Sequence, residues 1–168
     1  YLYVRYAKSL LEGNYLGIFD GYTLVKSISY AIYLYINNIL GIPYRLSLIL
    51  FYILAISALV YTLNKIIKST YFSVVLYLFL LYSPVMLHNE NIQKVYRGGV
   101  LVSSSILVIS CFIGIYASEK KMEKILWSIF GALSLPFFYY VKEDSIWIMP
   151  FICVIILIYC VKNWFLIK

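Results

Sequence analysis

The stretch LSLILFYILAISALVYTLN, residues 46–64, contains no charged side chain and is close to the length of a helix that crosses a lipid bilayer. Four further charge-free runs of roughly 17 to 21 residues have the same character, and they cover residues 69–87, 98–118, 125–141 and 145–161. Because lipid offers an open backbone no hydrogen-bond partners, such segments fold as helices. The sequence therefore predicts an all-α, polytopic transmembrane bundle with five long spans.

Composition excludes an ordinary soluble domain. Of the 168 residues, 64% are hydrophobic and only 12% are charged, and the mean hydropathy is +0.89. The net charge of +7 would suggest nucleic acid as the partner of a soluble protein. Basic residues beside apolar spans instead reflect the orientation bias of membrane insertion, so we expect a bilayer around the chain and no nucleic-acid partner.

Basic residues fall into two sets that alternate along the chain, which predicts the orientation of the spans. Short gaps contain one set, and we assign it to the cytoplasm: Lys65, Lys68, Lys120, Lys121, Lys124, Lys162 and Lys168. The other set is mixed with acidic residues, and we assign it to the outer face: Arg5, Lys8, Lys26, Arg45, Lys94, Arg97 and Lys142. Residues 1–44 then form an outer-face segment, and residues 45–168 contain the spans of one transmembrane domain.

Residues 1–44 contain two stretches with helical periodicity. In the first, apolar and aromatic residues lie opposite Arg5, Lys8 and Glu12, and Gly13 with Asn14 forms a stop. In the second, residues 28–40, isoleucines lie on one face and Tyr30, Tyr33 and Asn37 on another, before Gly41 and Pro43. We expect two short helices at the membrane interface, with a sixth span over residues 28–40 as the alternative.

Lys142, Glu143 and Asp144 form the most unusual local pattern, because three charged residues separate two spans by a very short gap. A charge at the centre of a membrane helix costs ~2.5 to 3.5 kcal/mol on insertion scales, so charges near the boundary favour a polar cavity or a fixed partner. The alternative is a solvated turn in which Asp144 or Ser145 caps the last helix.

Two cationic residues are candidates for phosphate binding. Arg97 precedes Gly98 and Gly99 at the start of a span, where a guanidinium group and helix N–H groups both suit phosphate. Lys26 lies between the two interfacial helices and would attract a lipid phosphate. The ordinary alternative for both is anchoring in the headgroup region.

Metal and soluble-type catalytic motifs are missing from the sequence. His88 and Glu90 fall short of a zinc ligand set, and Cys111, Cys153 and Cys160 lie inside apolar runs without paired spacing. There is no Gly-rich phosphate loop and no nucleophile elbow. We therefore predict no metal site from these residues.

Residues 6–17 (YAKSLLEGNYLG) and 22–30 (YTLVKSISY) resemble the first outer loop of the C-type glycosyltransferases, whose members include protein O-mannosyltransferases and lipid A aminoarabinose transferases. Lys26 and Tyr30 match a Lys-x-Pro-x-Tyr-like stretch of these enzymes, with Ile28 replacing the proline. Residues 142–150 (KEDSIWIMP) are similar to a basic-acidic-acidic-small-aromatic stretch of bacterial members. The family's presumed catalytic aspartate would fall just before Tyr1, so we expect the chain to be an N-terminal part of a longer protein.

The resemblance implies transfer of a sugar from a polyprenyl-phosphate carrier to an acceptor at the outer face of a bacterial plasma membrane. It makes Lys26, Tyr30, Arg97 and Lys142 candidates for substrate binding, and Glu143 and Asp144 candidates for the catalytic acid network. The resemblance leaves open whether a divalent cation takes part.

Two other functions stay open at this point. A transporter or channel module would use the acidic pair to bind a coupling ion, and it predicts charged residues well inside the spans. A non-enzymatic membrane scaffold predicts that the outer charges can be replaced without loss of function.

Overall fold

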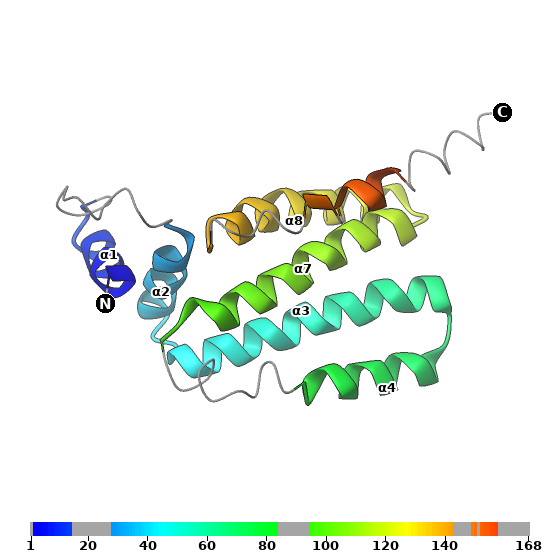
Figure 1. The fold of residues 1–168 in the computed structure, drawn as a ribbon, viewed down its shortest axis with the longest axis horizontal. Helices are drawn as coiled ribbons and strands as arrows, with labels where there is room; N and C mark the ends of the chain where they lie inside the picture. Colours follow the sequence, from blue (N-terminus) through cyan, green and yellow to red (C-terminus); the bar gives the residue numbers. More distant parts are fainter. Residues whose placement is uncertain (1, 15–27, 84–94, 143–148, 151, 158–168) are drawn as a thin grey trace.

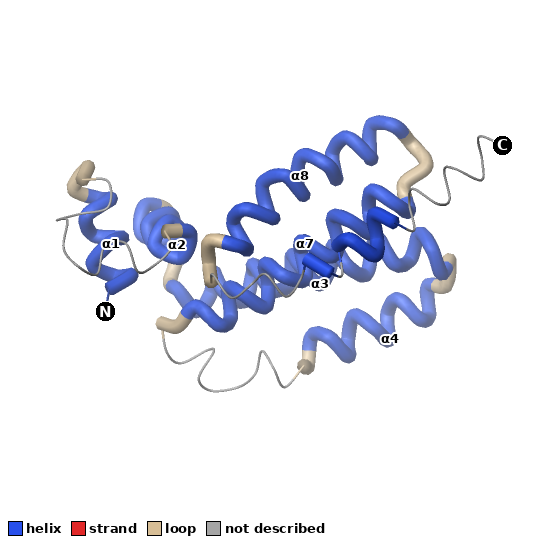
Figure 2. Tube along the Cα trace, turned by 45° about the horizontal axis from the view of Figure 1, so that its top comes forward, coloured by secondary structure: helices blue, strands red, loops and turns tan. Residues whose placement is uncertain are grey.

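A computed structural model of the chain describes residues 2–14, 28–83, 95–142, 149–150 and 152–157. This part of the chain is helical and contains no strand, which confirms the all-α prediction (Figure 2). The helices are α1 (Leu2–Leu11), α2 (Ser29–Ile39), α3 (Tyr44–Ile67), α4 (Thr70–Leu81), α7 (Arg97–Ala117) and α8 (Lys121–Tyr139). Residues 149–150 and 152–157 are also helical.

Helix α7 occupies the centre of the bundle. It packs against α3 on one side and α8 on the other, and α4 packs against α3 (Figure 1). Helices α3 and α7 run parallel, and α4 and α8 run in the opposite direction, while α1 and α2 lie together at the end of the bundle where α3 and α7 begin (Figures 1 and 2). Arg97 therefore lies at the end of the bundle next to α1 and α2, and Lys65, Lys68 and Lys120 lie at the opposite end.

Small residues let α7 approach both neighbours closely. A Cβ atom added to Gly99 would lie 2.9 Å from Cδ2 of Leu48 in α3, and one added to Gly114 would lie 2.5 Å from Cδ2 of Trp127 in α8. Buried serines on α7 satisfy their hydroxyl groups within the helix, as Ser103 does by donating to the Gly99 carbonyl at 3.0 Å. Small residues and locally bonded hydroxyls are typical of helix packing in membranes.

Only α3 and α7 are long and apolar enough to cross a membrane, so the prediction of five spans is not confirmed by the described residues. The helix expected over 69–87 is α4, which ends at Leu81 and at 12 residues is about 18 Å long. Helix α8 begins at Lys121, so its first turn also contains Glu123 and Lys124, and Pro136 lies inside it. The fifth run is described only at 149–150 and 152–157.

The two predicted N-terminal helices are confirmed as α1 and α2, and each ends where glycine allows a left-handed turn. Gly13 has φ +79° and Gly41 has φ +64°. The N–H of the following residue bonds back across each turn, from Asn14 to the Ser9 carbonyl and from Ile42 to the Asn37 carbonyl. With 11 residues, α2 is about 16 Å long, which is too short for the alternative of a sixth span.

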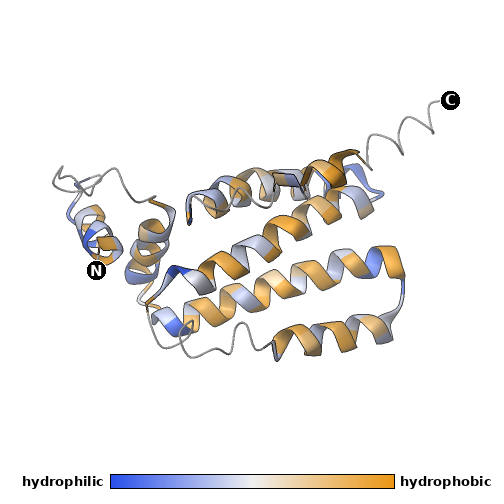
Figure 3. Cartoon of the chain, in the orientation of Figure 1, coloured by the Kyte–Doolittle hydropathy of each residue, from blue (hydrophilic) through white to orange (hydrophobic). Residues whose placement is uncertain are grey.

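Several positions in this protein are buried or exposed contrary to the usual soluble pattern. In α2, Tyr30 and Asn37 are buried while Ile36 and Ile39 are exposed. Along the long helices, many buried positions are serines, whereas the exposed positions are rich in leucine, isoleucine, valine and phenylalanine. Figure 3 shows that hydrophobic residues predominate along α3, α4 and α7. Large apolar surfaces of this extent on a folded chain mark contact with a partner or with lipid.

Candidate functional site

Four tyrosines and Arg97 meet where α1 and α2 lie against the start of α3 and α7. This tyrosine–arginine cluster consists of Tyr3, Tyr30, Tyr33, Tyr44 and Arg97. Arg97 donates from Nη1 to the Tyr3 hydroxyl at 2.8 Å, and the Tyr3 ring meets the Tyr30 ring edge-on at 5.0 Å between centroids. The structure thus brings two predicted binding residues, Tyr30 and Arg97, into contact with the same tyrosine.

Hydroxyl groups connect the cluster back to the start of α7. Tyr30 donates to the Tyr44 hydroxyl at 3.3 Å, and Tyr44 donates to the backbone carbonyl of Tyr96 at 2.8 Å. Because Tyr96 precedes Arg97, these contacts close a ring that involves α1, α2, α3 and α7. This closed set of contacts holds the Arg97 guanidinium group at the N-terminus of α7. The N-terminus of a helix has a partial positive charge, which also favours an anion.

A second polar chain lies beside the ring. The hydroxyls of Tyr33 and Ser47 are 2.6 Å apart, and Ser47 donates to Oδ1 of the buried Asn37 at 2.7 Å. The Tyr33 ring also stacks on that of Tyr30, with centroids 6.4 Å apart. Together these contacts fix α2 against the first turn of α3.

Burial raises the pKa of the Tyr30 phenol far above its usual value near 10, and the hydrogen bond to Tyr44 raises it further. Burial also raises the pKa of Tyr33, against a smaller opposite effect of Ser47. Both phenols therefore remain neutral at physiological pH. Their hydroxyl protons are already used in the bonds to Tyr44 and Ser47, so these phenols position the cluster and are not bases.

Lys142 lies at the same end of the bundle. It follows Val141, which is fully buried in one apolar cluster with Tyr30 and Val100. The remaining predicted site residues, Lys26, Glu143 and Asp144, lie outside the described residues.

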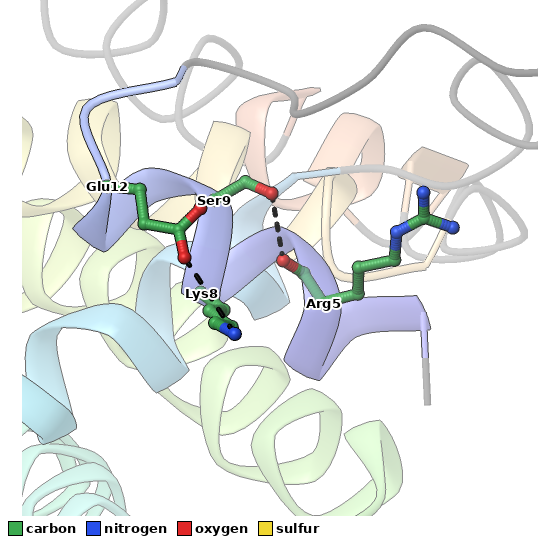
Figure 4. A network of polar contacts seen from close by, with 4 residues as sticks. All are labelled: Arg5, Lys8, Ser9 and Glu12. Atoms are coloured by element: carbon green, nitrogen blue, oxygen red, sulfur yellow. Dashed lines mark hydrogen bonds and ion pairs between the residues drawn. The ribbon is translucent and has the colours of Figure 1, made fainter.

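Helix α1 presents charged residues on its outer face. Lys8 and Glu12 form an exposed ion pair of 3.8 Å one turn apart, and Ser9 donates to the Arg5 carbonyl at 3.1 Å (Figure 4). The opposite face buries Tyr6 and Ala7. This amphipathic pattern is typical of a helix at a membrane surface.

An apolar hollow of about 340 Å³ adjoins the cluster. It lies between α3, α7 and α8, and aromatic side chains dominate its lining, among them Phe51, Phe130 and Phe137. Tyr33 connects the tyrosine–arginine cluster to the apolar hollow, because it lines the hollow while its hydroxyl contacts Ser47. A ligand with an anionic group and an apolar chain would fit this combination.

Metal binding has no support in the described part of the chain, where no group of three or more His, Cys, Asp or Glu side chains comes together. The acidic residues that the resemblance assigns to the site are outside that part.

Sequence reasoning missed Tyr3, Tyr33, Tyr44 and Ser47 as parts of the site. The spacing of Tyr30, Tyr33 and Asn37 on one helical face was a usable signal, because a polar face beside an isoleucine face indicates an interior contact in an apolar environment. The contact between Tyr3 and Arg97 had no such signal, because 94 positions separate the two residues.

Comparisons with known protein families, with curated proteins and with solved structures found no match for this chain.

Proposed function

We propose that the chain is part of an integral, multi-pass membrane glycosyltransferase that takes a sugar from a polyprenyl-phosphate carrier at the outer face of a bacterial plasma membrane. The observation that carries the proposal is the position of Arg97 and the tyrosine hydroxyls beside an apolar hollow, with Tyr33 common to both. A polyprenyl phosphate has the matching chemistry, an anionic head on a long apolar chain.

Membrane location is supported by the two long apolar helices and by the exposed apolar side chains. The charged residues of α3 and α7 lie near the helix ends: Arg45 is the second residue of α3, Lys65 is in its last turn, and Arg97 begins α7. This placement disfavours the transporter alternative, which requires charges deep inside the spans.

In the proposed mechanism, an acceptor hydroxyl attacks the anomeric carbon of the sugar while the bond from that carbon to the phosphate oxygen breaks. A carboxylate takes the hydroxyl proton, a role that the family resemblance gives to an aspartate just before Tyr1, and Glu143 and Asp144 are candidates for the acid network around it. Arg97, with Lys26 and Lys142, stabilises the charge that develops on the departing lipid phosphate. Tyr30 holds Tyr3 in position and thereby orients the guanidinium group.

The direct test is release or transfer of labelled sugar from a panel of polyprenyl-phosphate sugars by the full-length protein. We expect Arg97→Ala to lower the rate by about 100-fold, the usual effect of losing one group that stabilises a developing anion. Arg45→Ala is the matched control, because Arg45 is an exposed arginine near the same end of the bundle. Equal rates for the two variants, or no turnover of any donor by the parent protein, would refute the proposal.

The hollow is tested separately through binding. Leu107→Trp fills it from α7, and Leu54→Trp places the same ring on an exposed part of α3. We expect Leu107→Trp to weaken binding of a long-chain polyprenyl phosphate but not of a two-isoprene analogue, and Leu54→Trp to affect neither. If the parent, Leu107→Trp and Leu54→Trp bind each ligand with equal affinity, the hollow does not bind the polyprenyl chain.

A further inference from the structure

A second hollow lies at the opposite end of the bundle, where α3 ends and α8 begins. It has a volume of about 380 Å³ and is lined by Lys65, Lys68, Ala117, Glu119, Lys120 and Glu123. We call it the basic hollow. In contrast to the apolar hollow, five of its six lining residues are charged.

One of the two carboxylates in the basic hollow is already neutralised. Lys65 donates to Glu123 in an ion pair that joins α3 to α8, and its ammonium also lies 4.9 Å from the centre of the Tyr61 ring. The other charged residues of the lining are Lys68, Lys120 and Glu119. The three lysines and two glutamates give the lining a net charge of +1, so an anion is the complementary ligand.

The start of α8 adds to this preference for an anion. Lys120 is the N-cap residue of α8, and its side chain makes no capping hydrogen bond. The first N–H groups of a helix have no partner within the helix, and they carry the positive end of its dipole. Lys68, across the hollow, has φ 54°, and it is the only non-glycine residue with positive φ among the described residues.

The position of the basic hollow indicates which kind of anion would reach it. It lies at the ends of α3 and α7, the two helices that can cross a membrane, and therefore at the level of lipid headgroups if those helices span. We propose that the basic hollow binds the phosphate of an anionic phospholipid headgroup between Lys68 and Lys120. The site is independent of the proposed transferase site, which lies at the other end of the bundle.

The test uses the full protein in detergent, titrated with phosphatidylglycerol and followed by native mass spectrometry. Each lysine near an anionic membrane surface contributes about 1 kcal/mol, so Lys68→Gln with Lys120→Gln should weaken lipid binding roughly 30-fold. Lys121→Gln with Lys124→Gln is the matched control, because it removes two positive charges from the first turn of α8 that do not line the hollow. Lys68→Arg should retain binding.

Three outcomes would overturn the proposal. Equal losses in the two double variants would show a diffuse effect of charge, and equal binding of phosphatidylcholine would show that the anionic headgroup is not recognised. Inorganic phosphate that displaces the lipid at equal concentration would show a site for a soluble anion. Equal thermal unfolding of both double variants in lipid-free detergent ensures that changes in affinity report on the site.

Discussion

Replacing Gly114 by alanine tests the close packing of α7 against α8. The new Cβ atom would lie 2.5 Å from Cδ2 of Trp127 and 2.8 Å from Cε2 and Cγ, about 1 Å inside the usual carbon contact distance of 3.5–4.0 Å. The indole ring also packs near Tyr61, at 6.4 Å between centroids, so its movement away from α7 is restricted. The substitution therefore pushes α7 and α8 apart or forces Trp127 from its rotamer.

The expected change in the free energy of unfolding has two terms of opposite sign. Overpacking a close contact destabilises by about 1–3 kcal/mol. Alanine stabilises a helix by about 1 kcal/mol relative to glycine, which leaves a net loss of up to about 2 kcal/mol. Gly131→Ala is the matched control, because alanine gives it the same gain in helix propensity without a clash. Its Cβ atom would lie 3.4 Å from Cβ of Cys111, which is close to an ordinary contact. We expect that variant to equal or exceed the parent in stability.

Thermal unfolding in a neutral detergent, followed by circular dichroism at 222 nm, gives the comparison. The two alanine variants differ by the overpacking penalty of about 1–3 kcal/mol. A domain of this length shifts by about 2–4 °C per kcal/mol, so their unfolding temperatures should differ by roughly 2–12 °C. Adding Trp127→Leu to Gly114→Ala should remove most of the loss, because the atoms that clash are gone. Equal unfolding temperatures for the two single variants would show that α7 and α8 are not packed as described.

Three further predictions concern single residues. Lys68→Gly should raise stability in lipid-free detergent by about 1 kcal/mol, because glycine adopts the φ of 54° without strain; an unchanged or lower unfolding temperature would argue against the left-handed turn. Tyr30→Ala should destabilise by about 3–5 kcal/mol through the cavity it leaves, whereas Tyr30→Phe should lose only about 1 kcal/mol with its hydrogen bond to Tyr44; chemical denaturation of both variants measures the difference. The hydrogen bond from Lys65 lowers the pKa of Glu123 below its usual 4.5, so its stabilising effect is present above that pH and disappears as the pH falls through the lowered value. Unfolding temperatures measured between pH 6 and pH 3 should therefore fall more steeply for the parent than for Glu123→Gln, and parallel curves would contradict the pairing.

Local signals in the sequence predicted the helices and several of their ends correctly. Gly13 with Asn14, and Gly41 before Pro43, end α1 and α2 as expected, because only a residue that tolerates positive φ completes such a turn. The prediction was less accurate where hydropathy was the sole guide. The apolar run over 69–87 continues beyond Leu81, but α4 does not, since hydrophobicity indicates an apolar environment and does not by itself determine where a helix ends.

Two residues of the tyrosine–arginine cluster had been named from the sequence. Arg97 and Tyr30 were singled out by position and by the family resemblance, and the structure places both in one cluster. Their connection through Tyr3 depends on how α1 and α2 pack across the end of the bundle. Lys26, Glu143 and Asp144 remain predictions, because they lie outside the described residues.

By itself, the sequence predicted that the chain folds into helices, that its charges gather at the ends of apolar segments, and where the first two helices end. Composition and local stop signals suffice for these properties. Tertiary structure decided which face of each helix is buried, because an almost uniformly apolar segment has no periodicity that distinguishes its faces. The choice follows from where backbones can approach closely, at Gly99 and Gly114, and from where distant polar groups find partners, as Arg97 does in Tyr3 and Lys65 in Glu123.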